Sequence, residues 1–502
     1  MAAKAAAAEL WAQAGLPPSA LAHLSLPPSP SPPPSSFDVD AAAQAVVGVA
    51  ALAAAHLHAL RTRDDLSAVT VLARDAAAEF RSQDLALLGG ESAFEWDALA
   101  GAYKAKLGGW IRPHTNWRHH KVGLLDLLDL PHDASKAQLA EAFASRDADE
   151  VAEAAMDRGL VCTALRSFEE WDAHPQGRAA LERARHGPVR FSTSAPRPPR
   201  ALPASTSRRP LDSVRVLDLT RVIAGPVAGR VLAGYGADVL WVTSPSLPSL
   251  PGLDFDTSRG KRTLQLDLRS TPADRAAFER LVRDADVLLE SYRPGGLASL
   301  GFGPERLRDL NPDIVLADLT AWGSVHGDAA REGGPWSRRK GFDSLVQFAS
   351  GFGEAEGRAW SEWRSGRAGE EDGVGDWAPR ALPCQVLDHA TGYLTAFGIL
   401  AALYHRSTSG GAHLVTTTLL DTATWLRSLG RTDPSTEPFS VHLETQEELR
   451  GRGGTARLRG WEGKEVEYVE HAARFEGEVE VGWRTAPQGY ADGAAEWLAR
   501  GE

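Results

Sequence analysis

The chain has 502 residues, 43% of them hydrophobic and 24% charged, a composition typical of a globular protein with room for two or three domains. Its formal net charge of -12 argues against a nucleic-acid or membrane-surface partner, because both are polyanions that favour basic patches. Its two cysteines, Cys162 and Cys384, cannot form a disulfide framework, and no CxxC pair indicates zinc. We therefore expect a reducing compartment and no metal.

By composition, the N-terminal part divides into a terminal segment, a helical region and a linker. Residues 1–36 end in a Pro/Ser-rich stretch and predict a flexible N-terminus. Residues 37–191 are rich in Ala, Leu and charged residues and are mostly helical by periodicity. Residues 192–210 form a second Pro/Arg/Ser-rich linker. Because no apolar run reaches ~18 residues and the start resembles no targeting segment, we expect a cytoplasmic location.

After the second linker, short apolar strands alternate with helices. Strands are predicted at 214–219, 238–243, 262–268, 286–292 and 314–320. A helix is predicted over 270–285, because Ser/Thr, Pro and an acid follow one another at its start. This alternation predicts an α/β fold with a doubly wound, Rossmann-like parallel sheet.

A faint internal repeat links the two ends of the chain. Residues 38–61 align with 388–407, which pairs Asp38 with Asp388 and Gly48 with Gly398. Residues 69–81 align with 415–427, which pairs Asp75 with Asp421. Ala-rich helices match by chance, but a strand that enters a helix opened by Asp is a more specific pattern. We therefore favour a partial duplication.

Two basic segments have competing interpretations. Arg259, Lys261 and Arg262 indicate either a solvent-exposed turn or a phosphate contact beside a strand. His114, His119 and His120 surround Trp117, and we favour a mixed polar surface over a metal site because no acid stands at ligand spacing.

A single carboxylate, Asp388, lies at the N-terminus of a long apolar helix that is predicted from residue 386 onward. Asp is a common N-cap, because its side chain accepts from free backbone N–H groups of the first turn. The same position suits a nucleophile, since the helix dipole favours the ionised carboxylate and stabilises a nearby oxyanion. The segment alone leaves both roles open.

Several segments, in this order, resemble family III CoA-transferases of the CaiB/BaiF group. They are "RPLDSVRVLDLTRVIAGPVAGRVLAGYGADVLWV", "SRGKRTLQLDL", "ADVLLESYRPGGLASLGFGPERLRDLNPDIVLADLTAWG", "KGFDSLVQFASGFG" and "VLDHATGYLTAFGILAALYHR". The resemblance implies a CoA-binding large domain over 211–430 that carries the catalytic aspartate, with residues 431–502 as the family's C-terminal tail. Residues 37–191, including "GGWIRPHTNWRHHKVGLLDLLDLP", resemble the smaller α+β domain behind an aspartate-helix remnant. The chain therefore resembles two partial tandem copies.

The resemblance implies that the protein moves CoA between an acyl-CoA and a carboxylic acid. Asp388 would form a mixed anhydride and then an aspartyl-CoA thioester, with CoA as substrate and no metal. The implied CoA contacts are Val222, Ile223, Ala224, Leu266, Ser291, Tyr292, Arg293, Lys340 and Phe342. The family's usual acid after the second strand is replaced by Thr243 and Ser244.

Two alternative functions and two assemblies remain open. An α-methylacyl-CoA racemase-like isomerase needs a His–Asp pair, but the corresponding position is Phe342, and His389 points away from its neighbour Asp388. A relative that binds CoA esters without catalysis is the other alternative. Because family III enzymes are interlocked dimers, the chain is expected to form either a homodimer or an intrachain pseudo-dimer.

Overall fold

The largest sheet of the computed structural model has seven strands, and the structure describes residues 2–28, 33–193, 196–326, 332–366, 377–432 and 437–500. The strand order is β10-β9-β8-β11-β12-β13-β7, with β7 antiparallel and the others parallel. The strands are β7 Val189–Thr193, β8 Arg215–Leu219, β9 Asp238–Thr243, β10 Arg262–Gln265, β11 Val287–Glu290, β12 Val315–Thr320 and β13 His413–Thr418. The first six strands follow the Rossmann order, which confirms the predicted doubly wound α/β fold.

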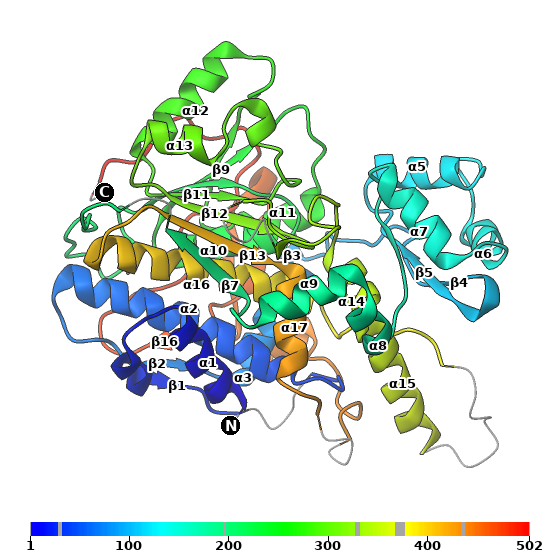
Figure 1. Cartoon of the computed structure of the whole chain (residues 1–502). Helices are drawn as coiled ribbons and strands as arrows, with labels where there is room; N and C mark the ends of the chain where they lie inside the picture. The colour runs from blue at the N-terminus through cyan, green and yellow to red at the C-terminus, as the bar shows by residue number, and fades with distance from the viewer. Residues whose placement is uncertain are drawn as a thin grey trace.

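Helices cover both faces of this sheet (Figure 1). On one face lie α10 Ala224–Gly234 and α16 Val386–Thr408, and on the other lie α12 Pro272–Asp284 and α13 Pro304–Leu310. Alternate strand residues enter the two cores: Val216 and Leu289 belong to the core that contains α10 and α16, whereas Leu217 and Leu288 belong to the core that contains α12. Because residues on both faces of the sheet are buried in this way, the strands are continuous apolar runs in the sequence.

A second long helix, α2 Val39–Thr62, packs on the outer side of α16 (Figure 1). Contrary to the expectation that no apolar run reaches the length of a membrane span, both helices are long and apolar enough to span one. However, 83% of the relevant window of α2 and all of that of α16 is buried inside the protein. Their hydrophobicity therefore serves the core, where α16 lies between the sheet and α2.

The prediction of a flexible segment over 1–36 is wrong for most of its described residues. Residues Ala2–Gln13 form helix α1, which packs on α2 and buries Trp11 completely. A short 3-10 helix, Pro18–His23, and strand β1, Leu24–Ser25, follow it. The alanines explain the helix, because Ala has the highest helix propensity and its small side chain lets two helices approach closely. Residues 29–32 of the Pro/Ser-rich stretch lie outside the described residues.

A smaller α+β region stands at one end of the main sheet (Figure 1, cyan). Its sheet has the order β4-β5-β6, built from Tyr103–Lys104, Trp110–Pro113 and Cys162–Ala164. Its helices are α5 Arg118–Leu127, α6 Lys136–Ala144 and α7 Ala148–Asp157. Helices α8 Phe168–Ala173 and α9 Pro175–Ala184 lead from it into β7. It packs on α14 Asp343–Ala349, which brings it beside the start of α16.

Other described elements complete the large domain. They are α4 Ser82–Leu85, α11 Pro251–Thr257, α15 Phe352–Ser365, α18 Gln446–Gly451 and a sheet of order β14-β15-β3 from Thr455–Arg459, Glu465–Val469 and Leu87–Leu88. In that sheet a strand of the N-terminal region pairs with the C-terminal tail: Val466 pairs with Leu88. The two ends of the chain therefore fold together.

The internal repeat corresponds to two structural units with the same strand register. The α16 unit consists of α16, β13, α17 Leu419–Ser428 and the antiparallel strand β7. The α2 unit consists of α2, β2 Val69–Val71, α3 Ala73–Glu79 and the antiparallel strand β16 Ala473–Phe475. In the α16 unit Val415 pairs with Phe191 and Thr416 with Arg190. In the α2 unit Val69 pairs with Phe475 and Thr70 with Arg474, so the same residue types meet at matched positions of the repeat.

Candidate active site

A cavity of about 690 Å³ lies along the carboxyl edge of the parallel strands. Each of the six parallel strands contributes its last residue or the residue that follows it. These residues are Leu219, Thr243, Leu266, Ser291, Thr320 and Leu419. Ligands of open α/β sheets bind at this edge, above all where the strand order reverses. Here the reversal falls between β8 and β11, whose loops both line the cavity.

The loop after β8 has a strained backbone. Val222 has a φ of 74°, which is rare for a β-branched residue because its Cβ crowds the backbone. Gly225, the second residue of α10, lies so close to the neighbouring loop that an added Cβ would be 2.3 Å from Ser291 Oγ. Ser291 Oγ itself has no hydrogen-bond partner among the described residues. Strain and an unpartnered hydroxyl at one spot are typical of a ligand site.

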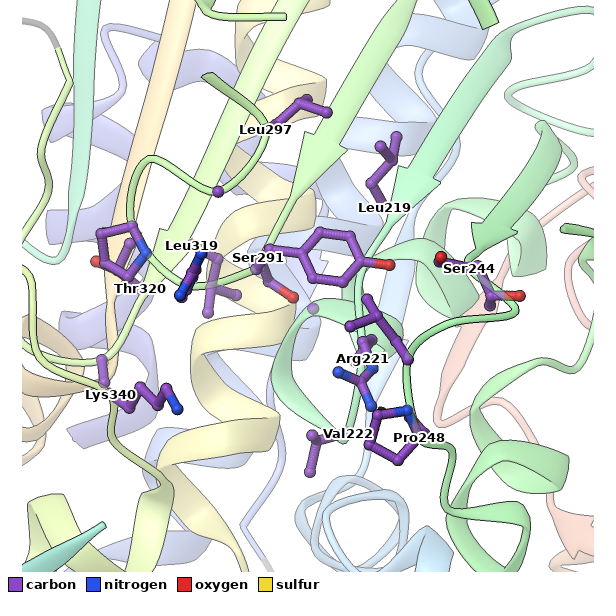
Figure 2. Close-up of a pocket in the computed structure, with 18 of the residues that line it drawn as sticks. Leu219, Arg221, Val222, Ser244, Pro248, Ser291, Leu297, Leu319, Thr320 and Lys340 are labelled. Atoms are coloured by element: carbon purple, nitrogen blue, oxygen red, sulfur yellow. Dashed lines mark hydrogen bonds between the residues drawn. The ribbon is translucent and has the colours of Figure 1, made fainter. Parts of the chain in front are cut away.

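The structure brings all the sequence-predicted site residues to the wall of this one cavity. They are Val222, Ile223, Ala224, Leu266, Ser291, Tyr292, Arg293, Lys340, Phe342 and Asp388. Figure 2 shows Ser291 and Leu319 in the middle of this wall, with Lys340 on one side and Ser244 and Pro248 on the other. These residues come from loops and helix starts up to 166 positions apart in sequence (222 to 388), so the fold assembles the site.

Asp388 lies in the first turn of α16 and is 7% exposed. Its carboxylate accepts no hydrogen bond found among the described residues, although its residue lines the cavity. The capping role belongs to a different residue, because the Asp343 Oδ2 atom accepts from the backbone N–H groups of Leu387 (2.7 Å) and Asp388 (3.1 Å). Of the two roles left open by the sequence, N-cap and nucleophile, the geometry therefore removes the first.

The pKa of Asp388 is raised well above its usual value, first by burial and then by the negative charge of Asp343. Burial also raises the pKa of Asp343 to about 6. This corrects the expectation that the helix dipole keeps Asp388 readily ionised, since burial and a second carboxylate outweigh the dipole. A more basic carboxylate is a stronger nucleophile once ionised.

The smaller α+β region supplies a wall of the cavity that sequence analysis missed. Trp117, His119 and His120 line the cavity together with residues of the large domain. His114 stacks on Phe342 with ring centroids 4.1 Å apart and an interplanar angle of 14°. His114 and His120 are buried, so the polar-surface interpretation is wrong for both. The sequence signal for this wall was the high density of aromatic and basic residues in 112–121. Phe342, on which His114 stacks, lies far away in sequence.

Both interpretations of the basic turn are wrong for Arg259 and Lys261. Arg259 and Lys261 are completely buried and neither lines the cavity. The Lys261 ammonium donates to Asp218 Oδ2 (2.7 Å), and the Arg259 guanidinium lies 4.4 Å from the ring centroids of both Tyr468 and Trp483. These cations hold the core together rather than facing solvent or phosphate.

The prediction that His389 points away from Asp388 is confirmed. Its Nε2 lies 2.7 Å from Gln83 Oε1, and its ring stacks on Phe80. Burial lowers the pKa of His389 to about 3, and it does not line the cavity. It therefore takes no part in an acid–base pair with Asp388.

Fold and cavity together define a doubly wound α/β domain whose sheet has, at its carboxyl edge, a carboxylate without a hydrogen-bond partner among the described residues. Residues 211–433 match the model of the family described as CoA-transferase family III.

Curated relatives carry transferase names. The chain is 35% identical to "Probable fatty acyl-CoA transferase Rv3272" of Mycobacterium tuberculosis, over 45% of this chain and 55% of the relative. It is 35% identical to the succinate–glutarate CoA-transferase of Agrobacterium fabrum, over 42% and 51%. It is 31% identical to an acyl-CoA transferase of Gibberella moniliformis, over 62% and 53%. The chain thus spans about half the length of these relatives.

Solved structures match a comparable share of the chain. A crystal structure of Rv3272 from M. tuberculosis matches with 34% identity, 44% of this chain, 56% of that chain and a TM-score of 0.35. A CAIB/BAIF family protein from Brucella suis matches with 29% identity, 43% of this chain, 55% of that chain and a TM-score of 0.33.

Proposed function

We propose that the protein transfers CoA between an acyl-CoA thioester and a carboxylic acid, with Asp388 as the nucleophile. The observation that carries the proposal is the Asp388 carboxylate, which is buried, faces the cavity and is relieved of capping by Asp343. The family match of residues 211–433 and the transferase names of the relatives support the same reaction.

The chemistry balances without any other reactant. A carboxylate oxygen of Asp388 attacks the thioester carbonyl, the C–S bond breaks, and CoA leaves as thiolate with the electron pair. The thiolate then attacks the aspartyl carbonyl of this mixed anhydride, which releases the first acid and leaves an aspartyl-CoA thioester. The incoming carboxylate repeats both steps in reverse order. Each intermediate is an activated acyl group, so we expect no step to have a strongly unfavourable free-energy change.

The cavity offers suitable contacts for CoA. Arg293 supplies positive charge for phosphates, and the apolar Val222, Ile223 and Leu266 supply a surface for the pantetheine arm. Ser291, whose hydroxyl is unpartnered among the described residues, stands beside them. Thr243 and Ser244 occupy the position of the family's usual acid and also line the cavity.

Covalent trapping tests the proposal. The protein is incubated with a panel of acyl-CoA esters, quenched, digested and examined by mass spectrometry for CoA or acyl adducts, and in parallel reduced with borohydride. We expect the adduct, or the alcohol produced by borohydride, on Asp388. Binding of CoA esters with no adduct across the panel would support the non-catalytic alternative instead.

The isomerase alternative has a separate readout. A racemase-like enzyme would exchange the α-proton of a 2-methylacyl-CoA with solvent deuterium without moving CoA. Phe342 cannot carry a proton, and His389 lies outside the cavity. We therefore expect CoA transfer without deuterium exchange.

We also infer that residues 37–191 and 211–502 are two partial copies that form one pseudo-dimer within one chain. The matched registers of β2 with β16 and of β13 with β7 support this, because each strand pair joins the two copies. Light scattering should then show a catalytically competent monomer. Mixing Asp388→Asn with Trp117→Ala protein should restore no activity, whereas restoration would indicate sites shared between chains.

A further inference from the structure

A second, much smaller cavity lies on the α12 face of the main sheet, next to the loop of residues 291–297. Its volume is about 20 Å³, and two acids line it: Glu290, the last residue of β11, and Asp318 of β12. The two residues are paired in register, so their side chains leave the same face of the sheet from strands about 4.8 Å apart. Leu288 and Leu316, two positions earlier on the same strands, belong to the core that contains α12. A pair of carboxyl groups therefore enters an apolar core.

The two carboxyl groups have no cation to neutralise them in the part of the chain that the structure describes, apart from any charge on His326. His326 is also the only other titratable residue, among the described ones, that lines the small cavity. The lining residues from β13, α13 and the segment before α13 are apolar or glycine. Ser324 donates its hydroxyl to Asp318 Oδ2 (3.2 Å). Burial raises the pKa of Tyr292 to about 12, so this neighbour of Glu290 stays neutral.

The surroundings favour one proton on the pair at neutral pH. Burial raises the pKa of Glu290 to about 8, and the negative charge of Asp318 adds to the shift. Burial also raises the pKa of Asp318, although His326 and Ser324 oppose that shift. Two like charges side by side in an apolar site are costly, and neighbouring carboxyl groups lose their protons as a coupled pair. Both acids are therefore ionised only when the pH rises through about 8.

Glu290 also closes the 291–297 loop. Its Oε1 atom accepts from the backbone N–H of Leu297 (3.1 Å), which connects the end of the loop to the residue before its start. Ser291, Tyr292, Arg293 and Leu297 all line the large cavity, and Figure 2 shows Ser291 and Leu297 on its wall. The position of the Glu290 side chain therefore determines the shape of this part of the wall.

Of the two acids, Glu290 is the one that can leave the small cavity. It ends its strand and is partly buried, whereas Asp318 is followed by two more strand residues and is 5% exposed. A second negative charge in the small cavity is relieved when the Glu290 side chain turns toward solvent. The loop then loses the hydrogen bond that closes it.

We propose that Glu290 is a positioning residue for CoA, and that it holds the 291–297 loop closed while Glu290 and Asp318 carry one proton between them. This rests on the proposed function, because Ser291, Tyr292 and Arg293 of the loop are implied contacts of CoA. The closed loop keeps a proton that the open loop releases, so a rise in pH shifts the equilibrium toward the open loop. CoA, which needs the closed loop, should bind more weakly at alkaline pH.

Titration calorimetry with free CoA between pH 6 and pH 9 tests the proposal, because free CoA binds without an acyl group to transfer. We expect the wild-type Kd to rise roughly 3- to 10-fold between pH 7 and pH 9. Asp318→Asn removes one charge of the pair and should give a flatter profile than the wild type. Because CoA ionises identically with every variant, differences between the profiles come from the protein.

Two substitutions of Glu290 separate positioning from a merely structural role. Glu290→Ala removes the acceptor for the Leu297 N–H and should weaken CoA binding at every pH. Glu290→Gln keeps an acceptor oxygen without a charge, so it should restore binding and show no alkaline weakening. Glu305→Gln, at an exposed acid of α13, is the matched control and should keep the wild-type profile.

Several results would overturn the proposal. They are a flat wild-type profile, a wild-type dependence that persists in both Asp318→Asn and Glu290→Gln, or a dependence that His326→Gln alone removes. If CoA does not bind at any pH, the proposed function fails and hydrogen exchange at the Leu297 amide decides. Protection, corrected for the intrinsic exchange rate, that falls between pH 7 and pH 9 in the wild type but not in Asp318→Asn supports the pair. Equal protection of the two proteins at both pH values overturns it.

Discussion

The α2 unit and the α16 unit share a strand register and a helix order, but of the two only the α16 unit supplies residues, Asp388 and Leu419, to the cavity described above. At the start of α16 the sheet continues through β12 and its neighbours, whose loops surround Asp388. At the start of α2, the described part of the chain places only two strands beside β2: β1, of two residues, and β16, of three. There Ser36 N–H donates to Glu356 Oε2 (3.0 Å), and Arg431 donates to Ser36 Oγ (2.7 Å). An acid at a helix start becomes a site only where neighbouring strands supply the loops.

The units also differ at the residue that the repeat pairs with Asp388. Asp38 is the N-cap of α2, whereas Asp388 is the third residue of α16. The nearest acid inside the first turn of α2 is Asp40, whose pKa burial raises to about 7. The α2 unit therefore keeps one acid of raised pKa, Asp40, but none of its residues lines the cavity beside Asp388.

The largest expected difference is in activity. Asp388→Asn keeps the shape of the side chain and removes the nucleophile, so CoA exchange should fall roughly 10³-fold or more. Asp40→Asn makes the same change in the α2 unit and should leave exchange unchanged. Initial rates of exchange between acyl-CoA and acid measure both. Equal losses of CoA exchange in the two variants would mean that the α2 unit and the α16 unit do not differ in catalytic role.

The second difference is in stability, at the matched aspartates Asp421 and Asp75. Arg183 Nε donates to Asp421 (2.8 Å), with side chains only 1% and 5% exposed. Arg452 Nη1 donates to Asp75 (2.6 Å), with side chains 21% and 11% exposed, and Arg474 is a second partner. Arg183→Met would leave a buried charge unpaired and cost about 3–5 kcal/mol, whereas Arg452→Met should cost about 1 kcal/mol or less.

Thermal unfolding followed by calorimetry compares the two arginine variants. The midpoint for Arg183→Met should lie well below that for Arg452→Met. A reversed order would mean that the α2 unit, not the α16 unit, limits the stability of the chain.

How far the sequence predicts this molecule depends on the range of each interaction. The strands and the loops that carry Val222 and Ser291 follow from local apolar runs and turns. Helix α1 does not, because an Ala-rich segment has no amphipathic pattern and its burial depends on α2. The burial of Arg259 depends on Tyr468 and Trp483, about two hundred residues away. The role of Asp343 as the cap of α16 needed the fold as well.

A smaller stability effect concerns the paired glycines Gly398 and Gly48. A Cβ at Gly398 would lie 2.6 Å from Val415 Cγ1 and 2.8 Å from Val189 Cγ1, and these β-branched side chains are stiff. At Gly48 the closest atom is the flexible end of Leu26, at 2.9 Å. Gly398→Ala should therefore cost about 1–3 kcal/mol. Gly48→Ala should be near neutral, since Ala is favoured in a helix by roughly 0.5–1 kcal/mol. Unfolding midpoints of the two variants check this order.

The smallest expected effect concerns the carboxylate next to Asp388 and the carboxylate next to Asp40. Asp343 raises the pKa of Asp388, and Asp38 raises that of Asp40. Because the nucleophile reacts when ionised, activity should rise with pH through the pKa of Asp388. Asp343→Asn removes the neighbouring negative charge while its amide oxygen still accepts from the α16 N-terminus. The acid limb of the kcat/KM profile should therefore move to lower pH, and Asp38→Asn should leave it in place. An unshifted limb in Asp343→Asn would mean that burial alone, rather than the paired carboxylate, sets the ionisation of Asp388.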